Sequence, residues 1–451
     1  MSANTEYDVL VVGGGLAGLS CALRLRARGR EPVVLEASDD VGGRVRTDVV
    51  DGFQLDRGFQ VLLTAYPEAR RVLDYGALNL RSFSPGVLVR RGRGFHPLSD
   101  PFRRPGQALV SAISAVGQPR DKLRLMRLRL ELGRAQAQQL RNRPDIPTID
   151  ALRGQGFSDR IIESFFRPFL GSVFFDWELA TSSRMYAFVM RSFFQASVAV
   201  PAAGMRAIPA QLAAGLPEGS VRLGTEVAEL GSDASPASWP GSAAPAAGSD
   251  ASPASWPGSA AAAAGLARVI LASGDRLTAN AVVVATEATV AATLVPSLGL
   301  VRSRSAAAVY FAAPKPPMDS PTLMLDGERS GPAKVAAVLS NVAPSYAPAG
   351  QSLIAAAVIG DHEEANGRLE AQVRQQMRRW FGMQVDAWRH LRTYRIPYAL
   401  PDQTAPMRLR QPVRIDATTF VCGDHRDTGS IQGALVSGRR TADAVAGDRR
   451  P

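Results

Sequence analysis

The residues best suited to chemistry begin with a glycine-rich run near the N-terminus. Gly13, Gly15 and Gly18 have the spacing G-x-G-x-x-G and directly follow the apolar run YDVLVV. In such a motif the first glycine permits a tight turn, the second lets the backbone approach a pyrophosphate, and the third allows close helix–strand packing. Glu36, near the end of the later run PVVLEA, is placed to bind ribose hydroxyls. The combination predicts a dinucleotide site and disfavours a purely structural turn.

A second glycine motif follows soon after Glu36. The run GGRVRT contains Gly42, Gly43 and Arg44. The glycine pair allows another loop to approach the pyrophosphate, and the arginine can bind it as a bidentate cation. Two separate motifs are therefore expected to converge on one dinucleotide.

These motifs must be positioned by a strand, a helix and a second strand. Residues 7–12 and 32–37 are short apolar runs typical of buried parallel strands. Between them, the leucines of LAGLSCALRLRARG recur at helical spacing up to Gly29. The three elements form one βαβ unit, in which the helix N-terminus offers unpaired N–H groups to an anion.

From this point the sequence resembles the superfamily of FAD-dependent amine oxidases, phytoene desaturases and protoporphyrinogen oxidases. The stretch VVGGGLAGLSCALRLRARGREPVVLEASDDVGGRVRT is similar to the N-terminal FAD signature of that group nearly residue for residue. GTEVAEL resembles the strand that reads adenine, and GDHRDTGSIQGALVSGRRTA resembles the C-terminal flavin signature. The resemblance implies FAD as the cofactor.

The resemblance also implies a role in FAD binding for individual positions. Gly13, Gly15, Ala17 and Gly18 would form the pyrophosphate turn; Glu36, with Ala37 beside it, would bind the adenosine ribose; Gly43 and Arg44 would contact the phosphates; the backbone near Val227 would read adenine; Gly423 and Asp424 would meet the ribityl–phosphate part; and the backbone around Ile431 would face the isoalloxazine. No catalytic residue is assigned.

The implied fold is α/β, with a Rossmann-type FAD-binding domain of the glutathione-reductase-like kind and a second, mixed α+β substrate domain. We expect the FAD-binding domain at residues 1–63, 205–300 and 412–451, and the substrate domain at 64–204 and 301–411. Residues 64–200 are expected to be largely helical. Residues 231–264 hold a tandem repeat, GSDASPASWPGSAAPAA and then GSDASPASWPGSAAAAA, whose composition predicts a disordered insert in a hairpin loop.

Two departures from the superfamily bear on the substrate. Amine oxidases usually have a lysine near the flavin on the strand matching SAAAVYFAAPKP and an aromatic residue just before the C-terminal helix. The matching positions here are Ala306 and Ser430, which speaks against amine oxidation. SIQGALVSGR and RIPYALP look closer to the carotenoid desaturases and protoporphyrinogen oxidases, which act on large apolar molecules. The aromatics of residues 165–175 are interpreted first as helix core and alternatively as the wall of an apolar tunnel.

The predicted function is an FAD-dependent oxidoreductase that dehydrogenates an apolar, carotenoid- or porphyrinogen-like small molecule by hydride transfer to the flavin. The flavin would supply the hydride chemistry, and the protein would supply orientation and exclusion of water. The alternatives are a flavin amine oxidase and a polyene isomerase without net oxidation. A binding module of the same fold, like the GDP-dissociation inhibitors, is least favoured because the glycines, Glu36, Arg44 and Asp424 are intact.

Charge and composition exclude several other classes. The net charge is +11, but all basic residues except Lys122, Lys315 and Lys334 are arginines, which suggests coding bias rather than a nucleic-acid-binding face. The four histidines are isolated, so we expect no metal site, although His425 follows the C-terminal signature closely. The only cysteines, Cys21 and Cys422, are expected to be buried thiols.

The location of the protein is predicted from its apolar segments. The first strand is expected to begin near Tyr7, which leaves no room for a signal peptide, and no apolar run reaches the length of a spanning helix. A cytoplasmic protein is therefore expected. Residues 105–134 join an apolar stretch to a leucine- and arginine-rich helix. This segment is interpreted first as a cap helix on the substrate domain and alternatively as a site of peripheral membrane contact.

Overall fold

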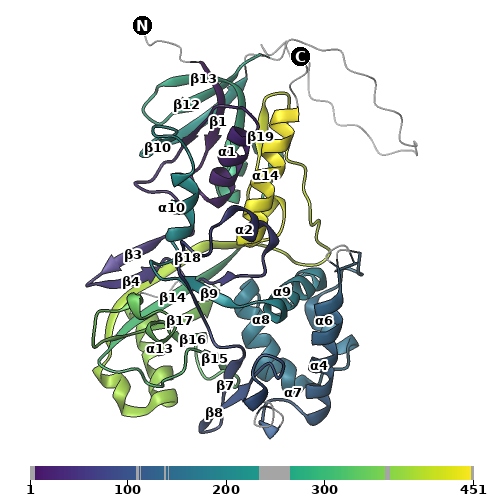
Figure 1. Cartoon of the computed structure of the whole chain (residues 1–451), viewed down its shortest axis with the longest axis vertical. Helices are drawn as coiled ribbons and strands as arrows, with labels where there is room; N and C mark the ends of the chain where they lie inside the picture. The colour runs from purple at the N-terminus through teal and green to yellow at the C-terminus, as the bar shows by residue number, and fades with distance from the viewer. Residues whose placement is uncertain are drawn as a thin grey trace.

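The computed structural model describes residues 6–107, 111, 113–136, 139–140, 142–232, 265–360 and 366–447. Two seven-stranded sheets dominate this part of the chain, one at each end of the long axis (Figure 1). Two small sheets lie outside them. They pair β3 (Thr47–Val50) with β4 (Phe53–Asp56), and β9 (Val198–Pro201) with β5 (Leu62–Leu63) and β6 (Leu80–Ser82).

The first large sheet has the strand order β10-β2-β1-β13-β12-β11, and β19 also pairs with β13. Five strands pair in parallel, β12 pairs antiparallel with β13, and β11 pairs antiparallel with β12, so β12 alone among these described strands runs in the opposite direction. The strands are β1 (Glu6–Val12), β2 (Pro32–Leu35), β10 (Val221–Arg222), β11 (Val227–Ser232), β12 (Ala267–Leu271), β13 (Arg276–Val284) and β19 (Thr419–Val421). The sheet thus brings residues from three distant parts of the chain together.

The alternation of β1 explains how this sheet is covered. Val9 and Val11 pack with the helices α1 (Leu16–Ala27) and α14 (Ile431–Gly447), whereas Leu10 and Val12 face the core on the opposite side. Helices α1 and α14 approach very closely, because a Cβ atom on Gly438 would lie 2.2 Å from the carbonyl oxygen of Ala17. Two shorter helices, α10 (Ala207–Ala214) and α11 (Ala288–Leu294), complete this half of the molecule.

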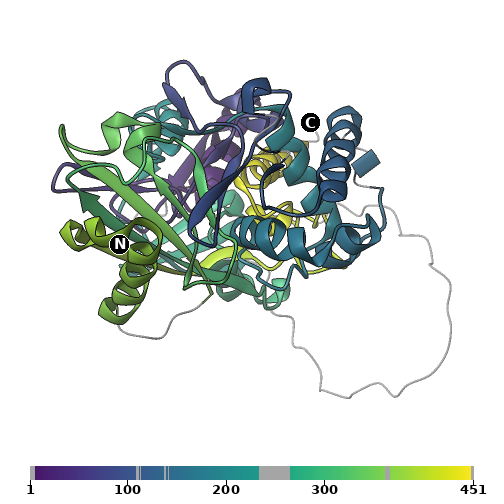
Figure 2. The same cartoon turned by 90° about the horizontal axis from the view of Figure 1, so that it is seen from below.

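The second large sheet has the order β18-β14-β17-β16-β15-β7-β8. Along β14, Ala307, Val309 and Phe311 pack with α13 (Asn366–Phe381), and Ala308 and Tyr310 face the opposite side. Figure 2 shows this sheet between α13 and the larger helical layer. The strands are β7 (Val87–Arg91), β8 (Gly94–Leu98), β14 (Ser303–Ala313), β15 (Leu323–Asp326), β16 (Ala333–Val338), β17 (Ser352–Ile359) and β18 (Arg389–Pro401).

The segment that contains most of the helical layer, residues 64–200, differs in one respect from the expectation. Residues 64–200 contain the expected helices but also strands that were not expected, because β6, β7 and β8 occupy much of residues 80–98. β7 pairs in parallel with β15, a strand far away in the sequence, so local periodicity could not reveal the partner. The helices of this segment are α2 (Pro67–Val72), α4 (Pro119–Arg134), α6 (Thr148–Gly154), α7 (Asp159–Ile161), α8 (Arg167–Phe174) and α9 (Ser183–Gln195), and the short α12 (Leu339–Val342) lies in the later part of the chain.

The expected fold class is confirmed: the chain is a mixed α/β protein with a Rossmann-type sheet and a second sheet-based unit. The five-segment division at particular residues stays a prediction. Beyond Ser232 the predicted repeat insert lies outside the described residues, and β11 and β12 flank it as an antiparallel pair. None of the described helices combines the length and the apolar character needed to cross a bilayer.

Candidate functional site

A cavity of about 600 Å³ begins at the carboxyl ends of the parallel strands. Its lining includes the residues that follow β1, β2, β13 and β19, and it continues to side chains of α8, α9 and β14. Ligands of open α/β sheets bind at this edge, outside the carboxyl ends of the strands. The cavity therefore joins a candidate cofactor site to the second unit.

The three motif glycines are required by different neighbours. Gly13 has φ +110°, and a Cβ atom there would lie 3.0 Å from the backbone of Ala285. A Cβ on Gly18 would lie 2.0 Å from the carbonyl oxygen of Gly13, so this glycine lets helix and turn pack. A Cβ on Gly15 would meet nothing within 4 Å, because this residue faces the cavity. Space for a ligand is thus left at the second glycine.

Glu36 is held at the cavity wall by the glycine turn. Its Oε2 accepts a hydrogen bond of 2.6 Å from the backbone N–H of Gly14, and its Oε1 accepts from the N–H and the hydroxyl of Ser38 at 2.9 and 2.6 Å. Each carboxylate oxygen has two lone pairs, so this fixed carboxylate can still accept from ribose hydroxyls.

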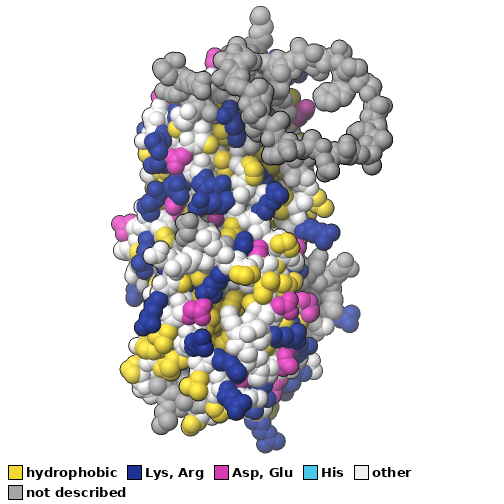
Figure 3. All heavy atoms as spheres, turned by 90° about the vertical axis from the view of Figure 1, so that its right-hand side faces the viewer, with side chains coloured by type: hydrophobic (Ala, Val, Ile, Leu, Met, Phe, Trp, Pro, Cys, Tyr) yellow, Lys and Arg dark blue, Asp and Glu magenta, His cyan; other side chains and the backbone are white. Residues whose placement is uncertain are grey.

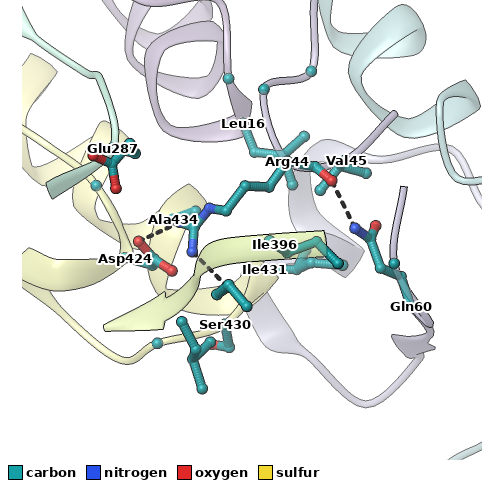
Figure 4. A pocket seen from close by; sticks show the side chains of 18 of the residues that line it. Leu16, Arg44, Val45, Gln60, Glu287, Ile396, Asp424, Ser430, Ile431 and Ala434 are labelled. Carbon is teal, nitrogen blue, oxygen red and sulfur yellow. Dashed lines mark hydrogen bonds and ion pairs between the residues drawn. The ribbon is translucent and has the colours of Figure 1, made fainter. Parts of the chain in front are cut away.

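Arg44 connects three parts of the chain (Figure 4). Its Nη2 lies 2.6 Å from Oδ1 of Asp424, and its Nη1 donates to the carbonyl of Ala399 at 2.9 Å. Burial alone would lower the pKa of Arg44, but the Asp424 carboxylate more than offsets this and the pKa is raised. Gln60 donates to the Arg44 carbonyl at 2.6 Å. The guanidinium therefore stays charged beside the candidate phosphate site.

The second glycine loop lies against the first. The N–H of Gly42 donates to the carbonyl of Gly14 at 2.9 Å, and Gly15 and Gly42 form an isolated parallel bridge. Gly43 has φ +58°, and a Cβ there would point to within 3.6 Å of the Gly15 Cα. The two motifs that were expected to converge on one ligand thus share one wall of the cavity.

The C-terminal signature forms another part of the wall. The N–H of Gly423 donates to Ser437 Oγ at 2.9 Å, and Asp424 begins the short helix η6 (Asp424–Arg426). His425 does not line the cavity; burial lowers its pKa to about 4, and neither ring nitrogen has a hydrogen-bond partner among the described residues. The imidazole is therefore neutral at physiological pH and packs against Gly423.

All but one of the residues predicted to bind FAD meet at this cavity. Gly18 lies beneath the turn, and the lining contains Gly13, Gly15, Ala17, Glu36, Ala37, Gly43, Arg44, Val227, Gly423, Asp424 and Ile431. Their individual roles remain predictions. Ala306 and Ser430, the positions at which amine oxidases usually have lysine and an aromatic residue, also line the cavity.

Three buried polar atoms test whether the cavity fits a polar ligand. Gln60 Oε1, Ser172 Oγ and Thr286 Oγ1 have no hydrogen-bond partner in the described part of the chain, and all three residues line the cavity. Buried polar atoms are nearly always satisfied, so these three indicate a bound molecule with polar groups. Together with the space beside Gly15 and the N-terminus of α1, they fit FAD.

Apart from the aromatics of residues 165–175, the sequence did not identify the residues at the far end of the cavity. Tyr66, whose hydroxyl hydrogen-bonds to Ser430, has a pKa raised by burial, so it is neutral there. Phe169, Phe193 and Leu323 close this end. They come from three separate elements and form no motif. For residues 165–175 both interpretations hold, since some aromatics are core and Phe169, Phe174 and Phe175 line the cavity.

Comparison with known proteins agrees with this geometry. Residues 16–242 and 256–446 match the model of the flavin containing amine oxidoreductase family. The chain therefore belongs to this family, which contains flavin-dependent oxidoreductases, and FAD is its cofactor.

Curated relatives match shorter segments. Protoporphyrinogen oxidase 2 of Arabidopsis thaliana is 25% identical over 163 residues, 36% of this chain and 32% of the relative. The 4,4'-diapolycopene oxygenase of Methylomonas sp is 39% identical over 62 residues, 14% and 12% of the two chains. The putrescine oxidase of Kocuria rosea is 46% identical over 69 residues, 15% and 14%. Each match spans less than a third of the relative.

Solved structures share the fold over nearly the whole chain. Cyclohexylamine oxidase from Brevibacterium oxydans IH-35A has a TM-score of 0.68 at 14% identity, covering 98% of this chain and 99% of that chain. An oxidoreductase from Methanosarcina mazei has a TM-score of 0.68 at 16% identity, covering 97% and 100%. At these identities the likeness establishes the fold alone.

Proposed function

We propose that this chain is an FAD-dependent oxidoreductase that dehydrogenates an apolar, carotenoid- or porphyrinogen-like small molecule by hydride transfer to the flavin. The observation that carries this proposal is the composition of the far end of the cavity. Phe169, Val173, Phe174, Phe193 and Leu323 line it, and the hydroxyls of Tyr66, Ser172 and Ser430 are polar groups of the same cavity. Such a wall favours a hydrocarbon and excludes water.

The chain's own residues would bind the cofactor and orient the substrate. Gly15, Glu36 and Arg44 would hold the dinucleotide, and Asp424 would keep Arg44 in place. When bound, FAD supplies a hydride acceptor. One substrate C–H bond would break with its electron pair passing to that acceptor, the neighbouring carbon would lose a proton that ends in bulk solvent, and a C=C bond would form between the two carbons. The substrate thereby loses two electrons in total.

Amine oxidation is the first alternative, because putrescine oxidase is among the relatives. The acidic residues that line the described cavity are Glu36, Glu226, Glu287 and Asp424, and none of them comes from α8 or α9. No lysine or histidine is found among the described lining residues. An ammonium group would therefore lack a carboxylate partner at the apolar end, which disfavours an amine substrate.

Isomerisation of a polyene without net oxidation is the second alternative. It needs the same apolar wall, so the cavity does not distinguish it from dehydrogenation. A binding module without flavin is disfavoured, since the glycine turn, Glu36 and Arg44 leave a polar space that a purely apolar ligand would not fill.

Anaerobic mixing experiments test the substrate class. The purified holoenzyme would be mixed with amines, with porphyrinogens and with carotenoid-like hydrocarbons in detergent, and the flavin absorbance would be followed. We expect bleaching by an apolar substrate and not by primary amines. Bleaching by amines alone would refute the proposal.

We also propose that the protein is cytoplasmic and that it touches anionic membranes through the outer face of α4. Leu123, Met126 and Leu130 are 68%, 41% and 39% exposed, while Leu128 and Leu132 pack inward. Apolar side chains lie among arginines on this side of the molecule (Figure 3). Apolar and basic surface together favour anionic bilayers. The inward face of α4 also fits the alternative of a simple cap helix.

Co-sedimentation with liposomes distinguishes these interpretations of α4. Binding to vesicles with anionic lipid at low salt is expected, and Leu123→Glu should reduce it. Leu300→Glu is a matched control, because Leu300 is 84% exposed outside this face. Absence of binding at low salt would leave the cap helix as the answer.

A further inference from the structure

A second cavity of about 490 Å³ lies beside the flavin cavity. Its walls come from β7 and β8 (Val87 and Leu98), from α4 (Leu125 and Met126) and from α9 (Met190). We call it the distal cavity. None of the motifs that predicted the cofactor site contributes a residue to it.

A thin partition separates the two cavities. Phe169, Phe193 and Leu323 line both of them. The rings of Phe169 and Phe193 are in contact, with their centroids 4.9 Å apart. One layer of side chains, contributed by α8, α9 and β15, therefore separates the flavin cavity from the distal cavity. Rotation of side chains in this layer would join the two spaces.

The charged groups of the distal cavity are already paired with protein atoms. Arg129 lies 2.8 Å from Asp100 and stacks on Phe102, whose ring centroid is 4.4 Å from the guanidinium carbon. Arg103 donates to the carbonyl of Ala196 at 2.8 Å. Lys122 donates to the Ser111 carbonyl at 2.7 Å. A ligand in this cavity gains mainly from apolar contacts and needs no charged or polar end group.

The outer end of the distal cavity lies on α4. Met126 both lines the cavity and is partly exposed, and Leu123 and Leu130 stand on the same outward side of the helix. The lining of the distal cavity thus extends from this exposed methionine to the partition.

We propose that the distal cavity binds the far end of an elongated hydrocarbon whose reacting carbons lie in the flavin cavity. This inference rests on the proposed function and narrows its substrate class to linear apolar molecules. A molecule that occupies both spaces must pass the layer of Phe169, Phe193 and Leu323 as a single chain. A disc-shaped porphyrinogen with charged side chains suits neither this passage nor the paired charges behind it.

Filling the distal cavity tests the proposal. Leu125 is half-buried and lines this cavity only, so Leu125→Trp should occupy space that the hydrocarbon end needs. Leu300→Trp is the control, because Leu300 is 84% exposed and lines neither cavity. Binding of lycopene and of the short hydrocarbon myrcene in detergent micelles would be followed by the perturbed absorbance of the bound flavin.

Leu125→Trp should weaken lycopene binding about tenfold or more, which corresponds to losing contact with two or so methylene groups. Myrcene binding, flavin content and melting temperature should stay unchanged, and Leu300→Trp should behave as the wild type. If Leu125→Trp does not fold, Met126→Trp fills the outer end of the same cavity. Equal lycopene binding by the filled and control variants would overturn the inference, as would no perturbation by lycopene at all. If either of these results occurs but a short hydrocarbon still bleaches the flavin absorbance, the proposed function stands and only the role of the distal cavity is wrong.

Discussion

Gly15 and Gly18 belong to one motif but are constrained by different atoms. Gly15 has an extended backbone (φ −73°, ψ 177°) and open space where a side chain would point. Gly15→Val should therefore fold with a nearly unchanged melting temperature. Because the valine would enter the space expected for the pyrophosphate, the Kd for FAD should rise about 100-fold or more, about 2.7 kcal/mol.

Calorimetric titration of the apoprotein with FAD measures this effect, and thermal melts of the same samples serve as the control. A Gly15→Val protein that binds FAD as the wild type does would show that the cofactor lies elsewhere. A protein that fails to fold would contradict the open space at this position.

At the residue scale, the cofactor side of the site could be predicted because its chemistry is local. Gly13, Gly15 and Gly18 lie in one turn, and Glu36 ends the neighbouring strand, so spacing alone identifies them. Tyr66, Ser172 and Phe193 come from separate segments that meet only in the folded chain. No spacing in the sequence relates them, which is why the substrate side was not identified.

At the element scale, the packing of α1 on α14 positions the pyrophosphate turn. A Cβ on Gly438 would lie 2.2 Å from the Ala17 carbonyl oxygen and 3.0 Å from the Cys21 nitrogen. Gly438→Ala should push α1 away and destabilise the protein by about 1–3 kcal/mol, as overpacking usually does. FAD affinity should fall as well, because α1 carries the turn at its N-terminus.

Urea unfolding and FAD titration of this variant measure the two effects. Gly447→Ala in the same helix is the control, because a Cβ there would meet nothing within 4 Å. Equal unfolding free energies of the two variants would show that the contact between α1 and α14 tolerates a side chain at position 438, contrary to the prediction.

Strands could be predicted from the sequence where the strand and its pairing partner are close together along the chain. The pairing of β11 with β12 and of β12 with β13 follows from consecutive apolar strands, and the βαβ unit follows from its own periodicity. β7 was missed because its partner β15 lies in a later segment, and the short run VLVRR carries little information alone. The signal that could have revealed a hairpin is the combination of this short apolar run with the glycine-containing turn that separates β7 from β8.

At the scale of the whole molecule, Asp56 lies where distant segments meet. Its carboxylate accepts hydrogen bonds from Thr47 Oγ1 at 2.6 Å, from the Met205 N–H at 2.9 Å and from the Tyr346 hydroxyl at 3.0 Å. Burial raises its pKa to about 6, although these hydrogen bonds oppose the change. The folded chain therefore binds this proton more tightly than the unfolded chain, whose carboxyl has a pKa of 3.8.

The resulting stability is fully present below about pH 4 and is lost as the pH rises through about 6. Between those values the free energy of unfolding should fall by on the order of 3 kcal/mol from this residue. Asp56→Asn removes the titration, so its unfolding free energy should depend less on pH in this range. Urea unfolding at several pH values measures both proteins, and identical pH dependence would contradict the role of Asp56.

The tandem repeat gives a second prediction for the whole chain. Deleting residues 231–247 leaves Gly248 and Ser249 in place of Gly231 and Ser232, so the end of β11 keeps its sequence. Flavin content and melting temperature should stay nearly unchanged, because loop-closure entropy depends only weakly on loop length. Loss of flavin on deletion would show that the repeat is part of the structure.

Net dehydrogenation of an elongated hydrocarbon is the activity that we propose for the bound flavin. The most direct test is an anaerobic single-turnover reaction with a linear polyene, in which reduced flavin and new double bonds are both counted. We expect one reduced flavin for each new C=C bond. Conversion of the polyene with the flavin still oxidised would contradict this expectation and would identify an isomerase.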